Sequence, residues 1–462
     1  MNKRILEQAC LGGGIVLLAL GAADPGRAEI NLIDRDGLKI DFSVSIGAFY
    51  AVTDDTNFGA GLTAANGLGK TTGVDRNVDW GEGYVLPRLT GSYAASFGEA
   101  YAGIGVVGSK TFGESGDAGG FTPNDPEDVE FEDGYAGWRS GDLLPGGHNI
   151  LDISAGRRQF QIGDGFLVWD GNFDSGEKGA FWLAPRLSFE YTAIARVDPE
   201  GPVRGDLFYL NADGDQGETE LAGVNLEYVH DTFGTVGASY MKLFRSEFAT
   251  RDDMDVFNLR AQGHPIPGLP DLFLSAEYVH EENDTDADSL AVDADAWYAE
   301  IGYTLSAVPW TPTLNYRFSQ FSGDDPSSAD FEGFDPLFYG FSRGLGTWFQ
   351  GEIVGEYLLF NTNMDAHMVY LSAHPRNDLT LGLLYFRFDL DEPAAGISNP
   401  LGVAASGEHF ADEINLHADW QITDNVFVSA VGAVAFPGKA AKQVFGDNDD
   451  YKLFEIYTIV TF

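Results

Sequence analysis

The chain has a single cysteine in 462 residues, Cys10, and it lies in an N-terminal segment that we expect to be removed. The residues before it, Glu7 to Ala9, do not form the small-residue box that precedes a lipidated cysteine. We therefore expect a mature protein without a thiol, which excludes disulfides and metal sites built on thiolates.

Long apolar runs are also missing. Beyond the N-terminus, no stretch approaches the roughly 18 to 20 uninterrupted apolar residues that a membrane-spanning helix needs. Basic residues are scarce, because 27 Lys plus Arg stand against 71 Asp plus Glu, and the net charge is −44. The sequence instead combines these acids with 58 Gly, 34 Phe, 19 Tyr and 8 Trp. That combination is typical of a barrel with aromatic girdles and long wet loops.

The N-terminus has the pattern of a signal peptide. Lys3 and Arg4 precede an apolar, glycine-interrupted run from Ala9 to Ala23. Small residues allow cleavage after residue 23 or after residue 28. We expect residues 1–28 to be a signal peptide and residues 29–462 to form one exported domain.

Long alternating segments follow along the mature chain. From Leu38 to Tyr50 every second residue is apolar, which indicates a half-buried strand longer than the roughly 3 to 10 residues usual in globular proteins. The pattern recurs at Val85–Phe97, Ala222–Tyr228, Trp297–Leu305, Leu314–Phe318, Ile353–Leu359, Ile414–Trp420 and Val426–Phe436. With weaker segments counted, we predict about 18 strands, give or take two.

Backbone hydrogen bonding decides how such strands are arranged. In hydrocarbon every N–H and C=O needs an internal partner, so crossing strands must close into a barrel. We predict an all-β fold, a transmembrane antiparallel β-barrel, and keep a secreted β-sandwich or propeller as the alternative. Tight turns at Phe97–Glu99 and Asp231–Gly234 are expected on the periplasmic side. Long acidic loops are expected outside, at Lys110–Asn149, Glu281–Asp293 and Phe321–Gly346.

The C-terminal segment Tyr451–Phe462 alternates up to its last residue. Phe454, Ile456 and the terminal Phe462 fall on one face. An aromatic terminus in this register resembles the assembly signal of outer-membrane barrels. We therefore expect Phe462 to engage the barrel assembly machinery, and expect outer-membrane lipid and lipopolysaccharide as surroundings.

Arginines on the polar faces of the predicted strands are the candidate functional residues. A ring of guanidinium groups inside a barrel would favour anions or bind carboxylates bidentately. The alternative is that they pair with lumen acids and only make buried charge tolerable; the two are compatible. The predicted pore-lining set is Arg88, Arg157, Arg158, Arg186, Arg196, Arg260, Arg317, Glu190, Glu300 and Glu352.

Neither a cofactor nor a resident metal is predicted. The stretch around Asp213 and Asp215 resembles half of an EF-hand, but its glycine is displaced and Ala222 stands where the bidentate glutamate belongs. These aspartates, like the acidic run from Glu281 to Asp288, either hold calcium loosely or are solvated surface.

The sequence Glu-Tyr-Val-His occurs twice, ending at His230 and His280. Each His shares a face with its Tyr at a strand end, which predicts a place in an interfacial belt. No serine or cysteine nucleophile is spaced to meet either one. His417 and Asp419 share the inward face with Asn415, where a lumen hydrogen-bond pair is the simpler prediction.

Three segments in order resemble the alginate-export family of outer-membrane channels. They are Gly156-Arg157-Arg158-Gln159-Phe160-Gln161-Ile162-Gly163-Asp164, then Gln350 to Ile353 continuing through Asn361, Asn363, His367 and Pro375, then Gly407 to Gly438. The resemblance implies an eighteen-stranded barrel with an arginine-rich, anion-selective lumen. Arg157 takes the family's arginine position and Asp164 its corner aspartate. Phe166 departs from it, since members often carry another arginine there.

Together these features predict an outer-membrane channel of a Gram-negative-type envelope and not an enzyme. The leading hypothesis is passive, selective passage of anionic sugars, uronate polysaccharide or other small anions. The second is a general diffusion porin that leans toward cations, because acidic loops set the potential at its mouth. An outer-membrane hydrolase or adhesin is the third. No nucleic acid is expected among the partners.

Overall fold

The computed structural model describes residues 29–61, 75–113, 116–122, 125–172, 176–230, 232–283, 291–340, 348, 350–395 and 404–462. The predicted signal peptide lies outside these residues, so its removal stays a prediction. Among the residues described, no helix has the length and apolarity that crossing a membrane requires.

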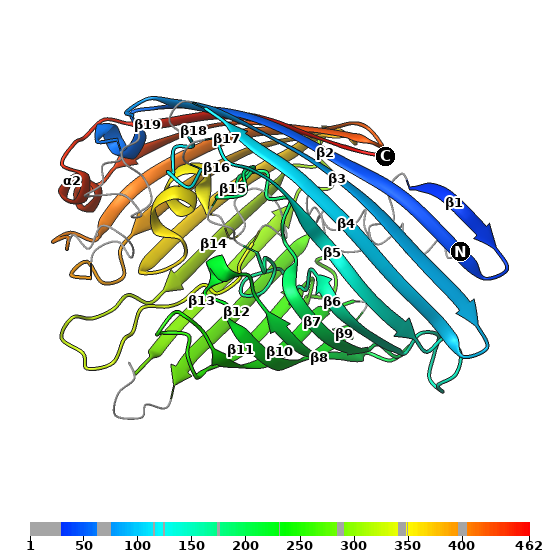
Figure 1. Ribbon diagram of the computed structural model, residues 1–462. Coiled ribbons are helices and arrows are strands. Elements are labelled where there is room, and N and C mark those ends of the chain that lie inside the picture. The colour runs from blue at the N-terminus through cyan, green and yellow to red at the C-terminus, as the bar shows by residue number, and fades with distance from the viewer. Residues whose placement is uncertain are drawn as a thin grey trace.

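Eighteen antiparallel strands, β2 to β19, form a closed barrel (Figure 1). Each strand pairs with its sequence neighbours, and β19 pairs with β2 to close the ring. A short strand β1 (Ile30–Arg35) precedes the barrel and pairs with the first part of β2. The barrel strands are β2 Leu38–Asp54, β3 Val78–Ala95, β4 Gly98–Phe112, β5 Glu127–Arg139, β6 Leu151–Arg158, β7 Phe189–Val197, β8 Val203–Asn211, β9 Glu220–His230, β10 Gly234–Arg245, β11 Met254–Gly263, β12 Leu272–Asn283, β13 Asp293–Thr304, β14 Thr313–Phe321, β15 Met364–Arg376, β16 Leu379–Asp389, β17 His409–Thr423, β18 Val426–Pro437 and β19 Tyr451–Thr461.

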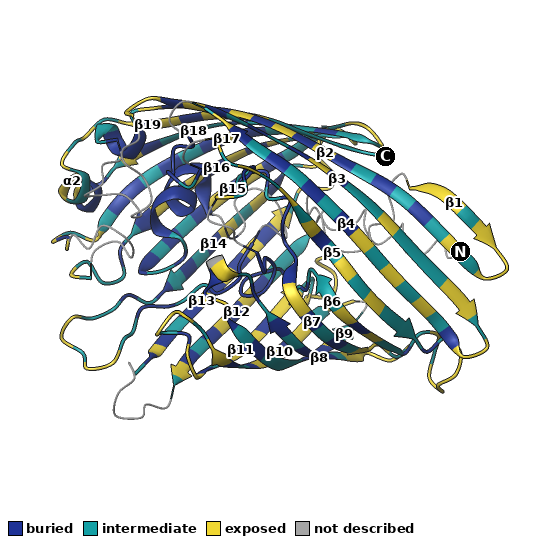
Figure 2. Cartoon of the chain, viewed as in Figure 1, coloured by how far each residue is buried: buried dark blue, intermediate teal, exposed yellow. Residues whose placement is uncertain are grey.

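Burial alternates along the strands, as the banding in Figure 2 shows. On β2, Ser43 and Ser45 are buried toward the interior, while Ile46 and Tyr50 are exposed on the outer surface. Apolar side chains on the outside and polar ones inside are what a barrel in lipid requires, and a soluble sandwich would have the reverse. The predicted register of β2 is therefore confirmed.

The two ends of the barrel differ in their connections. At one end, here called the turn end, β15 and β16 are joined by Asn377 and Asp378 alone. Asp36 and Gly37, which join β1 to β2 at that end, both have positive φ, 54° and 80°, as a tight Asp-Gly hairpin requires. At the other end, the loop end, long segments connect the strands. The loop end faces the exterior, because short turns face the periplasm in bacterial barrels.

Two predicted boundaries are wrong. The segment Lys110–Asn149 is not one loop, because it contains β5; a register shift between Gly105 and Val106 breaks the alternation opposite this strand. Ile353–Leu359 is not a strand, because it belongs to a buried π-helix, η3 (Gly351–Leu359). If this segment were a strand, its apolar residues would lie on both faces. The alternation there therefore does not distinguish a strand from a buried helix.

Among the described residues, three short helices are present besides η3. They are η1 (Thr56–Gly59), η2 (Gly214–Gln216) and α2 (Lys439–Phe445). All lie in loop-end connections, and α2 contacts β17 and η1. The N-cap of α2, Gly438, donates its N–H to the carbonyl of Phe410, which holds this helix against the strand wall.

The chain terminus closes the barrel. The N–H of Phe462 donates to the carbonyl of Val44 at 3.0 Å, and the N–H of Val44 donates back to the carbonyl of Phe462 at 2.9 Å. Phe462 and Val44 therefore form the final hydrogen-bonded pair of the seam between β19 and β2. β1 continues along β2 from there, since Ile30 lies opposite Phe42.

Deleting Phe462 is expected to lower the yield of assembled barrel several-fold, because the seam loses its last pair and the chain loses its terminal aromatic. The measurement is the fraction of protein in outer-membrane extracts that migrates differently with and without heating in detergent gels. Phe462→Tyr, which keeps both the pair and an aromatic ring, is expected to assemble normally. Equal yields for the deletion and the full chain would contradict the role of this residue.

Candidate functional site

The interior of the barrel is narrowed by two loop-end segments, whose described parts are residues 159–172 and 176–188 in the first and residues 322–340, 348 and 350–363 in the second. They join one another by a parallel bridge between Val168 and Phe338. The N–H of Trp169 donates to the carbonyl of Phe338 at 2.7 Å, and the N–H of Gly340 donates to the carbonyl of Gly165 at 3.0 Å. We call these two segments together the plug. The predicted outer loop that begins at Phe321 thus turns inward instead of standing in solvent.

Aromatic packing fixes the plug to the wall. Phe166 contacts Trp348, with ring centroids 4.7 Å apart, and Trp348 lies 4.7 Å from Tyr298 of β13. The Trp348 indole donates to the carbonyl of Asp164 at 3.1 Å. Phe166, the position that departs from the family pattern, is fully buried in this cluster. An arginine there would lack the apolar contacts that Phe166 makes.

The helix η3 is the most deeply buried part of the plug. All nine of its residues are buried, and Figure 1 shows its yellow coil within the ring of strands. Glu413 of β17 accepts the N–H groups of Ile353 and Val354 at 3.1 and 2.7 Å. A carboxylate at free N–H groups of a helix start is a favourable cap, so Glu413 seats η3 against the wall.

Carboxylates gather where η3 meets the wall. Glu352 and Glu356 of η3, Glu413 of β17 and Glu455 of β19 are all buried, and Glu352 lies close enough to Glu455 for each carboxyl to affect the pKa of the other. Burial raises the pKa of Glu352 well above its usual range, and the neighbouring Glu455 and Glu356 add to the rise. Burial likewise raises the pKa of Glu356. Glu352 was predicted to line the pore from a strand; it lies on the plug instead.

Most of the predicted arginines carry a carboxylate partner. Arg88 pairs with Asp133 of β5. Arg196 lies 2.6 Å from Asp206 of β8. Arg260 of β11 has the densest contacts, since it binds Glu227 at 2.7 Å and donates to Ser239 and Asn258 as well. These pairs support the interpretation that lumen acids neutralise inward arginines.

Arg186 and Arg317 hold the plug. Arg186 was predicted on a strand, but it lies before β7 in the plug, where it contacts Glu130 at 2.9 Å and Ser109 at 2.7 Å. Arg317 of β14 faces inward with its guanidinium 4.6 Å from the Trp348 ring and 4.0 Å from Glu300. Both arginines are buried, so they act as structural contacts between plug and wall.

Arg157 and Arg158 at the end of β6 are different. Arg158 donates to Ser154 at 2.9 Å and stacks 4.7 Å from the Tyr135 ring, and no carboxylate of the described residues forms an ion pair with it. The nearest carboxylate contact of Arg157 is Glu130 at 3.8 Å, and its buried Nε has no hydrogen-bond partner in the described structure. These two guanidinium groups are the least neutralised of the predicted set.

A second arginine and tyrosine pair lies beside them. Arg139 of β5 stacks 4.2 Å from the ring of Tyr101 on β4, and the Tyr101 and Tyr135 rings contact each other edge to face at 6.2 Å. Together Arg139, Tyr101, Tyr135 and Arg158 form a column on the inner wall, which we call the arginine–tyrosine column. Sequence reasoning missed the first three because Arg139 and Tyr135 stood in a segment taken for a loop. The available signal in β5 was the spacing of Tyr135 and Arg139, which are four residues apart and therefore share one face of a strand.

The remaining predicted residues have varied places. Glu190 is exposed near the start of β7, whereas Glu300 is buried on the inner wall of β13. Asp213 lies 3.3 Å from Lys178 in an ion pair, and whether this acidic stretch holds calcium loosely stays a prediction. The side chain of Asp215 lies outside the described structure. Whether the arginines and glutamates line a conducting pore stays a prediction.

The histidine motifs lie on the outer surface at opposite ends of the barrel. Tyr228 and Tyr278 are exposed, with His230 at the turn end of β9 and His280 at the loop end of β12. His417 is buried, with Asp419 2.9 Å from its Nδ1 and the Tyr370 hydroxyl 3.1 Å from its Nε2. The Tyr370 contact is a hydrogen bond, whereas Nδ1 and Asp419 are close without hydrogen-bond geometry, so the predicted pair is present as an ion-pair contact only.

Comparison with known proteins identifies the family. The model of a family described as alginate export matches residues 197–453, more than half of the chain. The chain belongs to the alginate export family. The match covers β8 to β18 complete, together with η3 and the plug segment around it. This member of the family is therefore an outer-membrane channel-type barrel, and its relatives are channels and not enzymes.

Solved structures share the fold at low identity. OccK5 (OpdH) of Pseudomonas aeruginosa is 12% identical with a TM-score of 0.54, over 92% of this chain and 98% of that one. OpdQ of the same organism is 13% identical with a TM-score of 0.55, over 92% and 97%. OccD3 (OpdP) is 11% identical with a TM-score of 0.55, over 95% and 93%. No protein of curated function matches the sequence. The fold and family place the chain in the outer membrane.

Proposed function

We propose that this protein is a passive channel that favours small solutes bearing carboxylates, uronates among them. The observation that carries the proposal is the arginine–tyrosine column, in which Arg158 has no carboxylate partner within the described part of the chain. A guanidinium that faces the lumen and is not neutralised attracts anions at close range and binds a carboxylate bidentately.

The tyrosines add a second element to this column. A ring held edge to face by its neighbour and stacked under a guanidinium presents a flat apolar surface beside a cation. A sugar acid offers both a carboxylate and an apolar ring face, so it matches that surface. The family description, alginate export, supports the same class of solute.

The lumen also has features of a selective channel and not a wide pore. The plug segments cross the interior and are held by Arg186 and Arg317 through the contacts given above. Solutes must therefore pass close to charged side chains, where water is limited and local charges act strongly. Loop charges outside are screened within about 8 Å at physiological salt, so the net charge of the chain matters less than the lumen.

One observation favours a second function, a cation-leaning general porin. The carboxylates of Glu352, Glu356, Glu413 and Glu455 gather on the side of the lumen that η3 covers, and no Lys or Arg forms an ion pair with them in the described structure. If these groups faced the permeation path, they would favour cations. Their complete burial under η3 is why we place this function second.

Reversal potentials in a salt gradient across planar bilayers test the proposal. Wild-type channels are expected to prefer anions, and Arg157→Gln with Arg158→Gln is expected to lower the anion-to-cation permeability ratio several-fold. Block of conductance by oligogalacturonate is expected to weaken in the same variant. The reason is that the two least neutralised guanidinium groups of the lumen are removed.

Arg376→Gln is the matched control. Arg376 lies at the turn end of β15, pairs with Asp378 at 2.6 Å and stacks over the outward Trp420, so it does not face the lumen. Its substitution is expected to leave the permeability ratio unchanged. A wild-type channel that prefers cations and does not respond to the double substitution would refute the anion channel and favour the general porin.

A further inference from the structure

Four side chains that ligate metals lie together on the outer surface at the loop end of β12 and β13. His280 and Glu282 alternate on β12, and Asp293 and Asp295 alternate on β13. In the strand register His280 lies opposite Asp295, and Glu282 lies opposite Asp293. Because residues two apart in a strand share a face, all four project outward.

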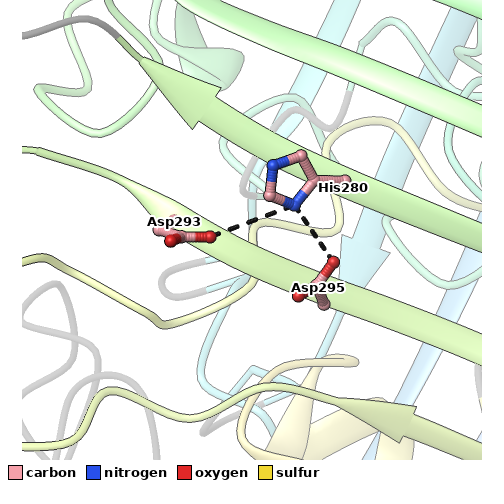
Figure 3. A group of neighbouring side chains, drawn as sticks. All are labelled: His280, Asp293 and Asp295. Carbon is pink, nitrogen blue, oxygen red and sulfur yellow. Dashed lines mark hydrogen bonds and ion pairs between the residues drawn. The ribbon is translucent and has the colours of Figure 1, made fainter.

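The two aspartates approach the same nitrogen of His280, as Figure 3 shows. Nδ1 of His280 lies 3.1 Å from a carboxylate oxygen of Asp295 and 4.0 Å from one of Asp293. One ligand atom of each of these three residues falls within 4.8 Å of the others. Ligand bonds of about 2.0 to 2.2 Å around a tetrahedral ion put its ligands roughly 3.4 Å apart. The observed separations lie on either side of that value.

Charge at this cluster is unbalanced. Glu282, Asp293 and Asp295 have the His280 imidazole as their only ion-pair partner within the described structure. The hydroxyl of Tyr278, two residues before His280 on β12, donates a hydrogen bond to Asp295. Three carboxylates around one imidazole leave a net negative charge even when the ring is protonated, and a divalent cation would neutralise it.

A neighbouring site shows the contrast. Asp255 on β11 accepts a hydrogen bond from Tyr240, as Asp295 does from Tyr278. There, however, Lys242 lies 3.0 Å from Asp255 and 2.7 Å from Asp253, so a lysine supplies the cation. At the β12–β13 cluster, no described lysine or arginine takes the place that Lys242 has at the neighbouring site. The His280 imidazole lies there instead.

The second plug segment, which contains Ser322 and Phe331, holds the end of β13 that carries Asp293 and Asp295. The N–H of Asp293 donates to the carbonyl of Phe331 at 3.0 Å, and the N–H of Asp295 donates to the Ser322 hydroxyl at 3.1 Å. The backbone of both aspartates is thus fixed before any ion binds. Rigid strand positions favour a site of defined geometry over a loose acidic surface.

We propose that His280, Asp293 and Asp295 bind one divalent transition-metal ion, with zinc the best match, and that Glu282 lies near enough to support it. Imidazole with carboxylates suits zinc, whereas calcium and magnesium take oxygen ligands. The site is open outward, beyond the aromatic Tyr278 and Trp297, so water completes the coordination. This goes beyond the passage of solutes, because the site lies on the outside of the barrel.

Metal binding to the full-length protein in detergent, purified without a histidine tag, tests this. Isothermal titration with zinc is expected to show one site in the micromolar range or tighter, and cobalt is expected to give a visible absorption band of nitrogen and oxygen coordination. His280→Ala and Asp293→Asn are each expected to weaken zinc binding at least about tenfold, because loss of even an outer-shell partner of a metal ligand costs about 10- to 100-fold in affinity.

Two variants serve as controls. Asp255→Asn removes an outward aspartate of the same kind, and His409→Ala removes a histidine whose two aspartates approach different ring nitrogens, Asp389 at 3.7 Å from Nδ1 and Asp412 at 3.1 Å from Nε2. Both are expected to keep zinc binding and the cobalt band. Zinc binding that is absent in the wild type, or equally strong in His280→Ala, would overturn the proposal and leave an ion pair only.

Discussion

Arginine in place of Leu416 is expected to destabilise the barrel by roughly 2 to 4 kcal/mol, the cost of a basic side chain near the bilayer midplane. Leu416 is exposed on the outer face of β17, and its partners are Leu383 on β16 and Gly432 on β18. The aromatic residue nearest the turn end on this strand, Trp420, lies four residues away. Leu416 therefore sits between the girdles, where a guanidinium finds neither water nor headgroups.

Urea unfolding of the protein in lipid vesicles measures this loss. Thr90→Arg is the control, because Thr90 lies on the inner face of β3 opposite Asp41, which offers the new side chain a carboxylate. It is expected to change the free energy of unfolding by less than about 1 kcal/mol. Equal losses for both variants would mean that the assigned inner and outer faces are wrong.

Raising the pH is expected to loosen the plug, because Glu352 is held in the protonated state by its surroundings. Burial and the nearby Glu455 and Glu356 raise its pKa. For an acid whose pKa is raised in the folded state, the stabilisation is complete below the ordinary glutamate pKa and is lost as the pH rises through the raised one. The ionised group then stands among three other carboxylates.

Single-channel conductance measures the effect. Between about pH 5 and about pH 9 we expect the open population of wild-type channels to rise, by about tenfold for each unit by which the pKa is raised. Glu352→Gln keeps a hydrogen-bond donor without the charge, so its conductance is expected to stay low and vary little with pH. Glu408→Gln, at an exposed loop-end position, is the control and is expected to behave as wild type. A wild-type conductance independent of pH would show that Glu352 does not hold η3.

The expected effects at Leu416 and Glu352 concern two different parts of the molecule, the barrel wall and the plug. Leu416 reports on the wall, whose strands are set by contact with lipid on one face. Glu352 reports on the plug, which is held by contacts that cross the lumen. A change in conductance without a change in stability would therefore locate an effect in the plug, and the reverse would locate it in the wall.

The wall could be predicted because its signal is local. In β2 and β19 the alternation of apolar and polar residues follows directly from having lipid on one face, and Phe462 marks the end of the chain in register. Closure then follows from the need to satisfy every backbone group in hydrocarbon. The fold and the channel class were predictable on this basis, and the family was predictable from the three segments that resemble it.

β5 and η3 were not predictable in the same way. β5 has a break in its pairing opposite Gly105 and Val106, which shifts the inward positions by one residue and removes the period of two. η3 is buried on every side, so its apolar residues face all directions, and the buried Glu352 and Glu356 lie among them. Neither a bulge nor full burial leaves a periodic pattern in the sequence.

The sequence by itself determined which residues face lipid, because one strand and its solvent decide that locally. Which arginines lie beside a carboxylate was decided only by the tertiary structure. Arg186 finds Glu130 56 positions away, and Arg260 finds Glu227 33 positions away, whereas Arg158 meets Tyr135 and no carboxylate in the described structure. Electrostatic pairing depends on distances between strands, and those distances exist only once the barrel has closed around its plug.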